Sequence, residues 1–395
     1  MKTGARKIQA GLLLASALCL TGWLGRPLLS RGQGMTQGLA PASPTRWRPN
    51  KPFAEAGYVG DGACARCHDD VAAKQRNTAM GYALETVAEA RVLRSHPRLT
   101  FRVGPYSYEI TRRGEQSIYS VTDGVRTISE PILYSFGQGK AGQTYVLRRG
   151  GAFYESRVSF YREIDGLDVT LGYPRGAPPS LEEAFGRQIS MDEARSCFAC
   201  HSTASVSGKN LQLEHLMPGV RCEACHGPGR EHVSAMEAKQ LADKRIFNPG
   251  RLSPDELSQE FCGSCHRSAE TVIEMNMLNL NNVRFQPYRT FTSRGHDPND
   301  ERMSCVACHD PHDSPRPEAA SYDPKCFSCH QSAAALKSPR AARAETAEGR
   351  AAKACPVGRQ NCVTCHMPKV ELPGAHFKFT DHRIRIARPG EPFPN

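Results

Sequence analysis

Residues 197–201 read Cys-Phe-Ala-Cys-His, and the pattern Cys-x-x-Cys-His occurs seven times in the 395-residue chain. We number these motifs 1 to 7 in chain order. Their cysteine pairs are Cys64 and Cys67, Cys197 and Cys200, Cys222 and Cys225, Cys262 and Cys265, Cys305 and Cys308, Cys326 and Cys329, and Cys362 and Cys365. The histidines that complete them are His68, His201, His226, His266, His309, His330 and His366. At this cysteine and histidine content chance would supply roughly 0.02 such motifs, so the repeat has a chemical cause.

The repeated motif is the attachment signature of c-type haem. Its two thiols form thioethers with the porphyrin, and the adjacent histidine is then held under the iron as proximal ligand. Zinc ribbons pair two Cys-x-x-Cys turns around one metal, and an odd number of turns leaves one without a mate. Iron–sulfur runs need further cysteines close by, and a thioredoxin-like turn normally occurs once. The sequence therefore predicts seven covalently bound haem c groups, each with one iron.

The spacing of the motifs predicts two kinds of structure. Motif 1 stands alone, whereas motifs 2 to 7 all lie within residues 197–366. So little chain per haem cannot build an ordinary side-chain core, and we expect the porphyrins to form the core, wrapped by short helices and loops. Between motifs 1 and 2, residues 106–110 and 152–158 alternate in strand fashion, with glycine-containing turns between such runs. The expected fold is a mostly α-helical or irregular multihaem cytochrome with an inserted antiparallel β-domain between motifs 1 and 2.

Residues 137–142 read Gly-Gln-Gly-Lys-Ala-Gly and formally match the dinucleotide-binding fingerprint G-x-G-x-x-G. A dinucleotide site needs a helix directly after this loop. A strand-like run over residues 145–147 follows instead. We therefore interpret the segment as the loop of a β-hairpin.

The N-terminus resembles an export signal. Three basic residues, Lys2, Arg6 and Lys7, precede an apolar run over residues 8–24. No clear A-x-A cleavage site follows, so an uncleaved membrane anchor is the alternative. We expect an exported protein in the periplasm or on the outer face of the cytoplasmic membrane. The predicted organisation is 1–34 signal peptide or anchor, 35–52 linker, 53–92 first haem segment, 93–175 β-domain and 176–395 six-haem domain, in which residues 332–353 form an exposed, partly helical insertion.

The formal net charge of +11 does not indicate a nucleic-acid-binding protein. Residues 1–34 carry five of the basic side chains, so the rest of the chain has a charge of +6. Each bis-histidine haem adds about −1 when ferric and about −2 when ferrous, because of its propionates and porphyrin dianion. Seven such haems bring the total to about −1 or about −8, so the arginines and lysines mainly balance propionates. We expect no nucleic-acid partner.

Seven histidines lie outside the motifs, one for each haem. They are His96, His215, His232, His296, His312, His376 and His382. His232 and His312 follow motifs 3 and 5 so closely that the chain cannot fold back onto its own iron, so we expect each to bind the iron of a neighbouring haem. Asp381 directly precedes His382 and can orient its imidazole as an iron ligand.

The remaining candidates for iron ligands are less distinct in the sequence. His376 is predicted as a ligand with His382, and His215 and His296, each upstream of a motif, are further candidates. His96 is predicted to be a surface histidine. Met80, on a helix expected over residues 70–87, competes for the seventh position, and a thioether ligand would raise the potential of that haem. Filling of the core is the alternative role for Met80.

The segments YVGDGACARCH, GVRCEACHGPGREH and CVACHDPH resemble the multihaem cytochromes c with doubled Cys-x-x-Cys-His motifs, a group that includes the tetrahaem electron acceptor of hydroxylamine oxidoreductase. The ending CVTCHMPKVELPGAHFKFTDHRIRI is similar to the end of larger members. The resemblance covers residues 57–92 and 197–386. In many relatives the position equivalent to Met80 is a distal histidine. The resemblance therefore also implies that Met80 is an iron ligand. The Cys-x-x-Cys-Lys motif of pentahaem nitrite reductase is absent from this sequence.

The resemblance implies electron transfer. We expect closely packed, mostly bis-histidine haems that pass single electrons from a quinol-linked or periplasmic donor to a terminal reductase or an extracellular acceptor. One alternative is a redox enzyme in which one five-coordinate haem acts on a small nitrogen compound or peroxide. A conductive filament of stacked subunits is another. No catalytic residue is predicted, and Cys355 reads as a free thiol or a link between subunits.

Overall fold

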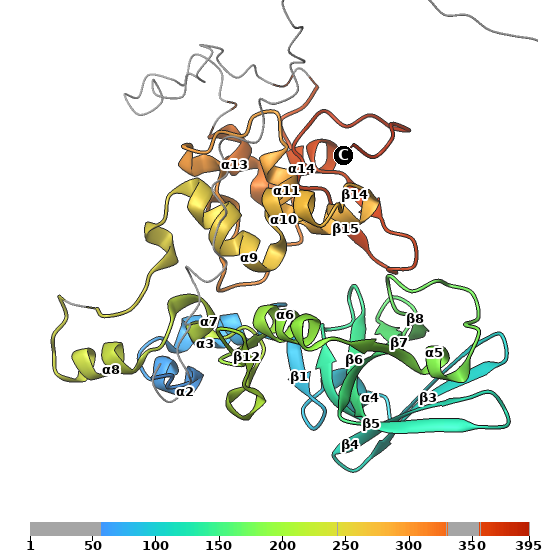
Figure 1. Ribbon diagram of the computed structural model, residues 1–395. Coiled ribbons are helices and arrows are strands. Elements are labelled where there is room, and N and C mark those ends of the chain that lie inside the picture. The colour runs from blue at the N-terminus through green and yellow to red at the C-terminus, as the bar shows by residue number, and fades with distance from the viewer. Residues whose placement is uncertain (1–56, 243, 329, 331–354, 356, 395) are drawn as a thin grey trace, which may run out of the picture. The chain divides into compact units, whose positions relative to one another are not determined.

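The computed structural model describes residues 57–242, 244–328, 330, 355 and 357–394 (Figure 1). The predicted signal or anchor, the linker, the cysteine at position 329 and the insertion over 332–353 lie outside the described residues. Within the described residues, no helix has the length and apolar character needed to cross a membrane.

The largest element is an antiparallel sheet of nine strands, drawn in the blue-to-green part of Figure 1. The strands are β1 (Leu84–Thr86), β2 (Arg98–Val103), β3 (Tyr106–Arg113), β4 (Gln116–Thr122), β5 (Thr127–Phe136), β6 (Gln143–Arg149), β7 (Ala152–Tyr161), β8 (Gly166–Val169) and β9 (Gly186–Ile189). Strands β2 to β8 pair in chain order, while β1 pairs with β5 and β9 with β7. Because β2 and β8 contact each other, the sheet is strongly curled.

The sheet has an ordinary side-chain core. Along β3, Tyr106, Tyr108 and Ile110 alternate with more exposed residues and are buried, as the strand period of two requires. They pack in one cluster with Tyr145 of β6 and Phe160 of β7. The short helices α4 (Arg91–Ser95) and α5 (Leu181–Phe185) close this cluster. This part of the chain buries its apolar side chains without any cofactor.

The predicted fold class is wrong, because the chain is not mostly α-helical or irregular. The nine-stranded sheet dominates the N-terminal half of the described chain, and it reaches beyond residues 93–175 in both directions. Leu84 of β1 pairs with Phe136, and Ile189 of β9 pairs with Phe153. These added strands are three and four residues long, too short to show a reliable alternation in the sequence. The hairpin loop predicted over 137–142 is confirmed, since it joins the paired strands β5 and β6.

The motif segments consist of short helices and turns. The α-helices are α2 (Asp61–Ala65), α3 (Asp69–Arg76), α6 (Met191–His201), α7 (Cys222–His226), α8 (Arg230–Glu237), α9 (Gly263–His266), α10 (Ala269–Glu274), α11 (Gln286–Phe291), α12 (Cys305–Cys308), α13 (Asp323–Phe327) and α14 (Cys362–His366). The tighter or wider helices are η1 (Leu213–His215), η2 (Pro249–Arg251), η3 (Glu256–Cys262), η4 (Leu280–Arg284), η5 (Glu301–Met303) and η6 (Ala319–Tyr322). Three small two-stranded sheets pair β10 (Ser202–Thr203) with β13 (Met217–Pro218), β11 (Val206–Ser207) with β12 (Asn210–Leu211), and β14 (Lys369–Glu371) with β15 (Lys378–Thr380).

The helix expected over residues 70–87 is much shorter than predicted. Helix α3 ends at Arg76, and the Thr78 hydroxyl donates to the Gln75 carbonyl (2.7 Å) and accepts from the Gly81 N–H (3.0 Å). A threonine that bonds the backbone in this way favours a turn over a continuing helix. Met80 therefore lies in a turn between α3 and β1.

Candidate haem sites

One cavity of about 3970 Å³ opens onto the motif segments. Ordinary small-molecule pockets hold about 300–1,000 Å³, so this cavity has room for several large ligands side by side. It is lined by side chains from motifs 2 to 7, namely Cys200, His201, Cys222, Cys225, His226, Cys262, Cys265, His266, Cys305, Cys308, His309, Cys326, His330, Cys362, Cys365 and His366. Its surface is mostly apolar, as a porphyrin face requires.

Short helical turns arrange the residues within each motif. In α7 and α14 the two cysteines and the histidine occupy positions i, i+3 and i+4 of one helix, and such positions share one face. In motif 1 the His68 N–H donates to the Cys64 carbonyl (2.9 Å), which closes the same kind of turn. The local sequence thus presents both thiols and the imidazole to one ligand.

Hydrogen bonds to main-chain carbonyls set the ring orientation of several histidines. The Nδ1 atom of His201 lies 3.0 Å from the Ala83 oxygen, that of His226 lies 2.9 Å from the Phe247 oxygen, and that of His366 lies 2.8 Å from the Arg385 oxygen. An Nδ1–H that donates to a carbonyl leaves the lone pair on Nε2 for a metal. His232 and His382 make the same contact, with the oxygens of Lys244 (2.5 Å) and Thr380 (3.0 Å).

Three motif histidines face a second histidine at the spacing expected for an intervening iron. The ring centroids of His68 and His232 are 6.5 Å apart, those of His226 and His312 are 6.0 Å apart, and those of His309 and His382 are 6.2 Å apart. Imidazole nitrogens bind metals at about 2.0–2.1 Å, so two opposed rings on one metal have centroids roughly 6 Å apart. The residues therefore fit haem with two axial histidines at motifs 1, 3 and 5.

Burial keeps several of these imidazoles neutral, as iron ligation requires. It lowers the pKa of His226, His266 and His309 below the usual value, and it lowers the pKa of His382 to about 4. A neutral imidazole has a lone pair to donate to a metal, whereas the imidazolium has none.

The structure brings the predicted ligands His232, His312 and His382 opposite motifs 1, 3 and 5, and each comes from the segment that follows another motif. His376 is placed differently. Its Nε2 lies 2.7 Å from the Asp168 carboxylate, and its ring packs on Tyr161 of β7. The nitrogen that would bind iron therefore faces a carboxylate, and the geometry does not favour His376 as a ligand.

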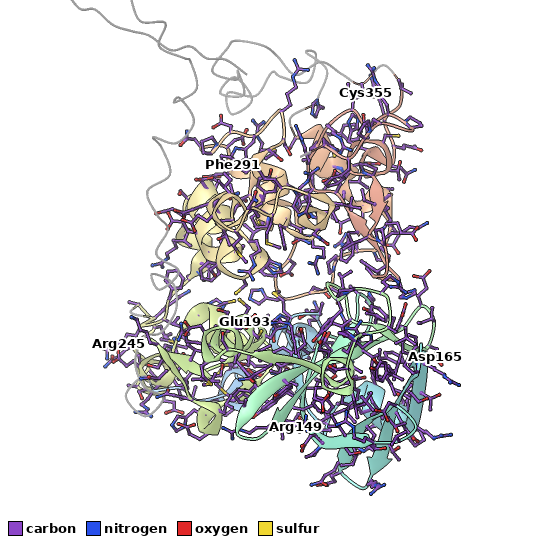
Figure 2. The ribbon with its side chains drawn as sticks, turned by 45° about the vertical axis from the view of Figure 1, so that its right-hand side comes forward. Arg149, Asp165, Glu193, Arg245, Phe291 and Cys355 are labelled. Atoms are coloured by element: carbon purple, nitrogen blue, oxygen red, sulfur yellow. The ribbon has the colours of Figure 1, made fainter. Side chains whose placement is uncertain are left out.

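The other predicted ligands take varied positions. Met80 lines the large cavity, so its side chain is placed where it could contact a bound haem. His215 lies at the end of η1 with its ring partly exposed, and the ring of His296 packs on Phe291. His96 bonds the Val92 oxygen with one ring nitrogen and Asp165 with the other; Asp165, labelled in Figure 2, lies in the turn between β7 and β8. Cys355 is exposed.

Three contacts join the motifs in pairs. The side chain of the first cysteine in one motif lies next to the first cysteine of another: Cys64 next to Cys222, Cys262 next to Cys305, and Cys326 next to Cys362. The geometry thus places motif 1 beside motif 3, motif 4 beside motif 5, and motif 6 beside motif 7. Motif 2 meets motif 4, where the Cys200 thiol lies 3.9 Å from the Ser264 oxygen.

Two carboxylates that the sequence reasoning missed hold such pairs together. Glu223, inside motif 3, accepts from the N–H groups of Val59, Gly60 and Gly229 at 2.8–2.9 Å. Asp323, just before motif 6, accepts from the N–H groups of Asn361 and Cys362 at 2.7–2.8 Å. The sequence signal for Glu223 was a charged residue between the two cysteines of its motif. No such signal marks Asp323.

Residues 179–227 match the family model described as cytochrome c554 and c-prime, and residues 296–335 match the model of the doubled CXXCH motif. No curated protein sequence matches the chain significantly. A structure titled as the outer cell wall cytochrome OcwA aligns with a TM-score of 0.45 at 16% identity, over 83% of this chain and 79% of that chain.

Proposed function

Because this chain is a multihaem c-type cytochrome, we propose that it relays electrons through seven haem c groups, one at each Cys-x-x-Cys-His motif. When bound, the haem irons carry single electrons by cycling between the ferric and ferrous states. The chain's own residues attach them, supply axial nitrogens and exclude water from the cavity. The observation that carries the proposal is the set of three histidine pairs spaced for an iron between them.

Contacts between motifs support a continuous route. Cysteine contacts join motifs 1 and 3, 4 and 5, and 6 and 7. Distal histidines cross the remaining gaps, because His312 from the motif 5 segment faces motif 3 and His382 from the motif 7 segment faces motif 5. Motif 2 joins at motif 4 through Cys200. Every motif therefore has a neighbouring motif to receive an electron from or pass one to.

The haem content of the purified protein tests this function. We expect its mass after denaturation to exceed that of the polypeptide by seven haems, and all seven to be reduced by dithionite and reoxidised in air. A protein with fewer covalent haems, or with haems that do not accept electrons, would contradict the proposal.

A second candidate function is small-ligand chemistry at one open haem, on a small nitrogen compound or a peroxide. The opposed histidine rings described above belong to motifs 1, 3 and 5, so the sixth iron position at motifs 2, 4, 6 and 7 has no assigned ligand. A carbon monoxide difference spectrum of the reduced protein separates the two functions. Uptake of CO by one haem in seven favours the enzyme, and no uptake favours the relay.

We further propose export and redox protein partners on the outside of the cytoplasmic membrane. The basic and apolar N-terminal pattern supports export. A quinol-linked or periplasmic donor and a terminal reductase or extracellular acceptor fit a relay of this kind. Fractionation of cells tests the location, and a crosslinking experiment in the periplasm tests the partners.

A further inference from the structure

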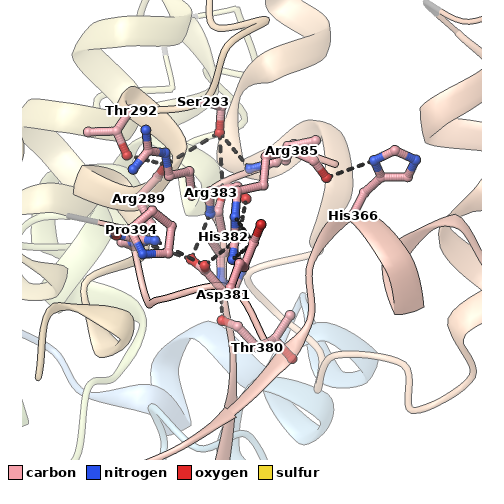
Figure 3. Close-up of polar contacts among 12 residues, drawn as sticks. Arg289, Thr292, Ser293, His366, Thr380, Asp381, His382, Arg383, Arg385 and Pro394 are labelled. Carbon is pink, nitrogen blue, oxygen red and sulfur yellow. Dashed lines mark hydrogen bonds and ion pairs between the residues drawn. The ribbon is translucent and has the colours of Figure 1, made fainter. Parts of the chain in front are cut away.

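A fully buried ion pair lies beside the distal ligand of motif 5. Arg289 of α11 and Asp381 are both 0% exposed, and the guanidinium donates to the two carboxylate oxygens at 2.8 and 2.9 Å (Figure 3). Two parallel hydrogen bonds of this kind fix the relative position of both groups. Burying two charges is costly unless the geometry is good and further bonds are made, so the other partners of Asp381 matter.

Asp381 has two more partners close in sequence. Its carboxylate accepts from the Arg385 guanidinium (2.7 Å) and from the Arg383 N–H (3.0 Å). Arg385 also pairs with Glu391 at 3.0 Å. The two arginines and the two carboxylates balance in charge, so removing the charge of Asp381 would leave one buried positive charge in excess.

The chain around Asp381 holds His382 on both sides. The His382 Nδ1 atom bonds the Thr380 oxygen, the Ser293 hydroxyl donates to the His382 oxygen (3.3 Å), and the Ile384 N–H donates to the same hydroxyl (2.8 Å). Ser293 comes from the end of the segment that carries Arg289. The ion pair and the hydroxyl therefore anchor the residues before and after His382 to one support.

Arg385 connects the same carboxylate to motif 7. The Arg385 N–H donates to the His366 oxygen (3.2 Å), and the His366 Nδ1 atom bonds the Arg385 oxygen at 2.8 Å (Figure 3). The main chain of Arg385 thus sets the ring orientation of His366, while its side chain is held by Asp381. The Asp381 carboxylate is therefore linked, through neighbouring residues, to His382, the distal histidine of motif 5, and to His366, the proximal histidine of motif 7.

We propose that Asp381 is a positioning residue for two iron ligands at once, His382 at the haem of motif 5 and His366 at the haem of motif 7. The inference rests on the proposed function. The negative charge of Asp381 also opposes reduction of both irons when haem is bound, because a nearby negative charge favours the ferric over the ferrous state. A salt bridge that merely held the C-terminal segment would affect neither haem selectively.

The Asp381→Asn variant tests this role, since it keeps the side chain's size and removes its charge. We expect the seven-haem protein to bind CO at up to one haem per chain more than the wild type, and its ferric form to gain a high-spin signal in electron paramagnetic resonance. The midpoint potentials of two of the seven haems move upward, and the other five stay in place. His382→Ala provides the reference spectrum for complete loss of that ligand.

Asp168→Asn is the matched control. Asp168 is also a largely buried carboxylate, paired with Arg175 (2.6 Å) and His376 (2.7 Å), and it contacts none of the histidines paired around an iron position. We expect wild-type CO uptake and potentials from this variant. An Asp381→Asn protein with wild-type spectra and potentials would overturn the proposal, and so would a change that Asp168→Asn reproduces.

Arg385→Gln decides the question if Asp381→Asn does not fold. This side chain is less buried, at 17% exposed, and its substitution removes the link between Asp381 and the main chain that bonds His366. Loss of a positive charge moves the potentials of the same two haems downward, opposite to the first variant; a shift in all haems or in none rejects the proposal. A wild-type protein with too few haems would overturn both this role and the proposed function, whereas intact haem content with unresponsive variants overturns only the role of Asp381.

Discussion

The nine-stranded sheet and the motif segments are stabilised in different ways. In the sheet, side chains such as Tyr145 and Phe160 fill one another's gaps, and the strands satisfy each other's backbone groups. In the motif segments, α-helices of four to eleven residues surround a cavity of about 3970 Å³. The sheet therefore forms its core from its own side chains, whereas the motif segments need the haems to fill the cavity between them.

Preventing haem attachment gives the largest expected effect on this comparison. In a variant with all motif cysteines changed to alanine, we expect the sheet to fold and the described motif segments around the cavity to remain open, because the cavity loses the groups that fill it. Hydrogen exchange measured by mass spectrometry would show protection over residues 98–169 and little elsewhere. Equal protection in both regions would show that the motif segments do not need haem to fold.

Removing a core side chain of the sheet is expected to have the next largest effect, a loss of stability. Phe160 is 2% exposed, and Phe160→Ala should cost about 3–5 kcal/mol of unfolding free energy. The haem absorption spectrum should stay unchanged while the sheet is folded. Val125→Ala, at a hairpin residue that is 94% exposed, serves as control and should change stability by less than about 0.5 kcal/mol. A denaturant titration followed at the β-sheet circular dichroism band measures both.

Breaking the link between motifs 1 and 3 should have a moderate and local effect. Glu223→Gln replaces one of the two acceptor oxygens that bind Val59, Gly60 and Gly229, which costs about 1–3 kcal/mol when a buried group loses its partner. We expect faster hydrogen exchange over residues 57–76 and unchanged exchange in the sheet. Faster exchange throughout the protein would argue against a local clamp.

The smallest expected effect concerns a surface pair on the sheet. The Arg98 guanidinium donates to Glu109 at 2.6 Å, and this hydrogen bond holds the pKa of that carboxyl below its usual value. The stabilisation is therefore present above the usual pKa and is lost as the pH falls through the lowered one. Glu109→Gln should cost less than about 1 kcal/mol at pH 7, and the difference from wild type should vanish in acid. Unfolding curves at a series of pH values test this, and a cost that persists in acid would exclude the ion pair as its source.

Long-range pairing explains where the sequence-based fold prediction was wrong. Strands β1 and β9 exist because their partners β5 and β7 lie next to them in space, and no local pattern of three or four residues shows this. The turn at Thr78 likewise ended a helix that residues 70–87 otherwise favoured. The strand errors arose where long-range pairing decided the backbone, whereas the helix error arose from local bonds of Thr78 to residues three positions away.

The sequence by itself determined the chemistry of the chain. Two thiols and an imidazole on one helical turn form a local pattern, so seven repeats of it predict haem attachment without any knowledge of the fold. Only the tertiary structure decided which histidine faces which motif, because His232, His312 and His382 each reach a motif outside their own segment. It alone also placed Arg289 against Asp381, 92 residues away. A buried charge gives no sequence signal of its partner, since the partner is chosen by packing in space.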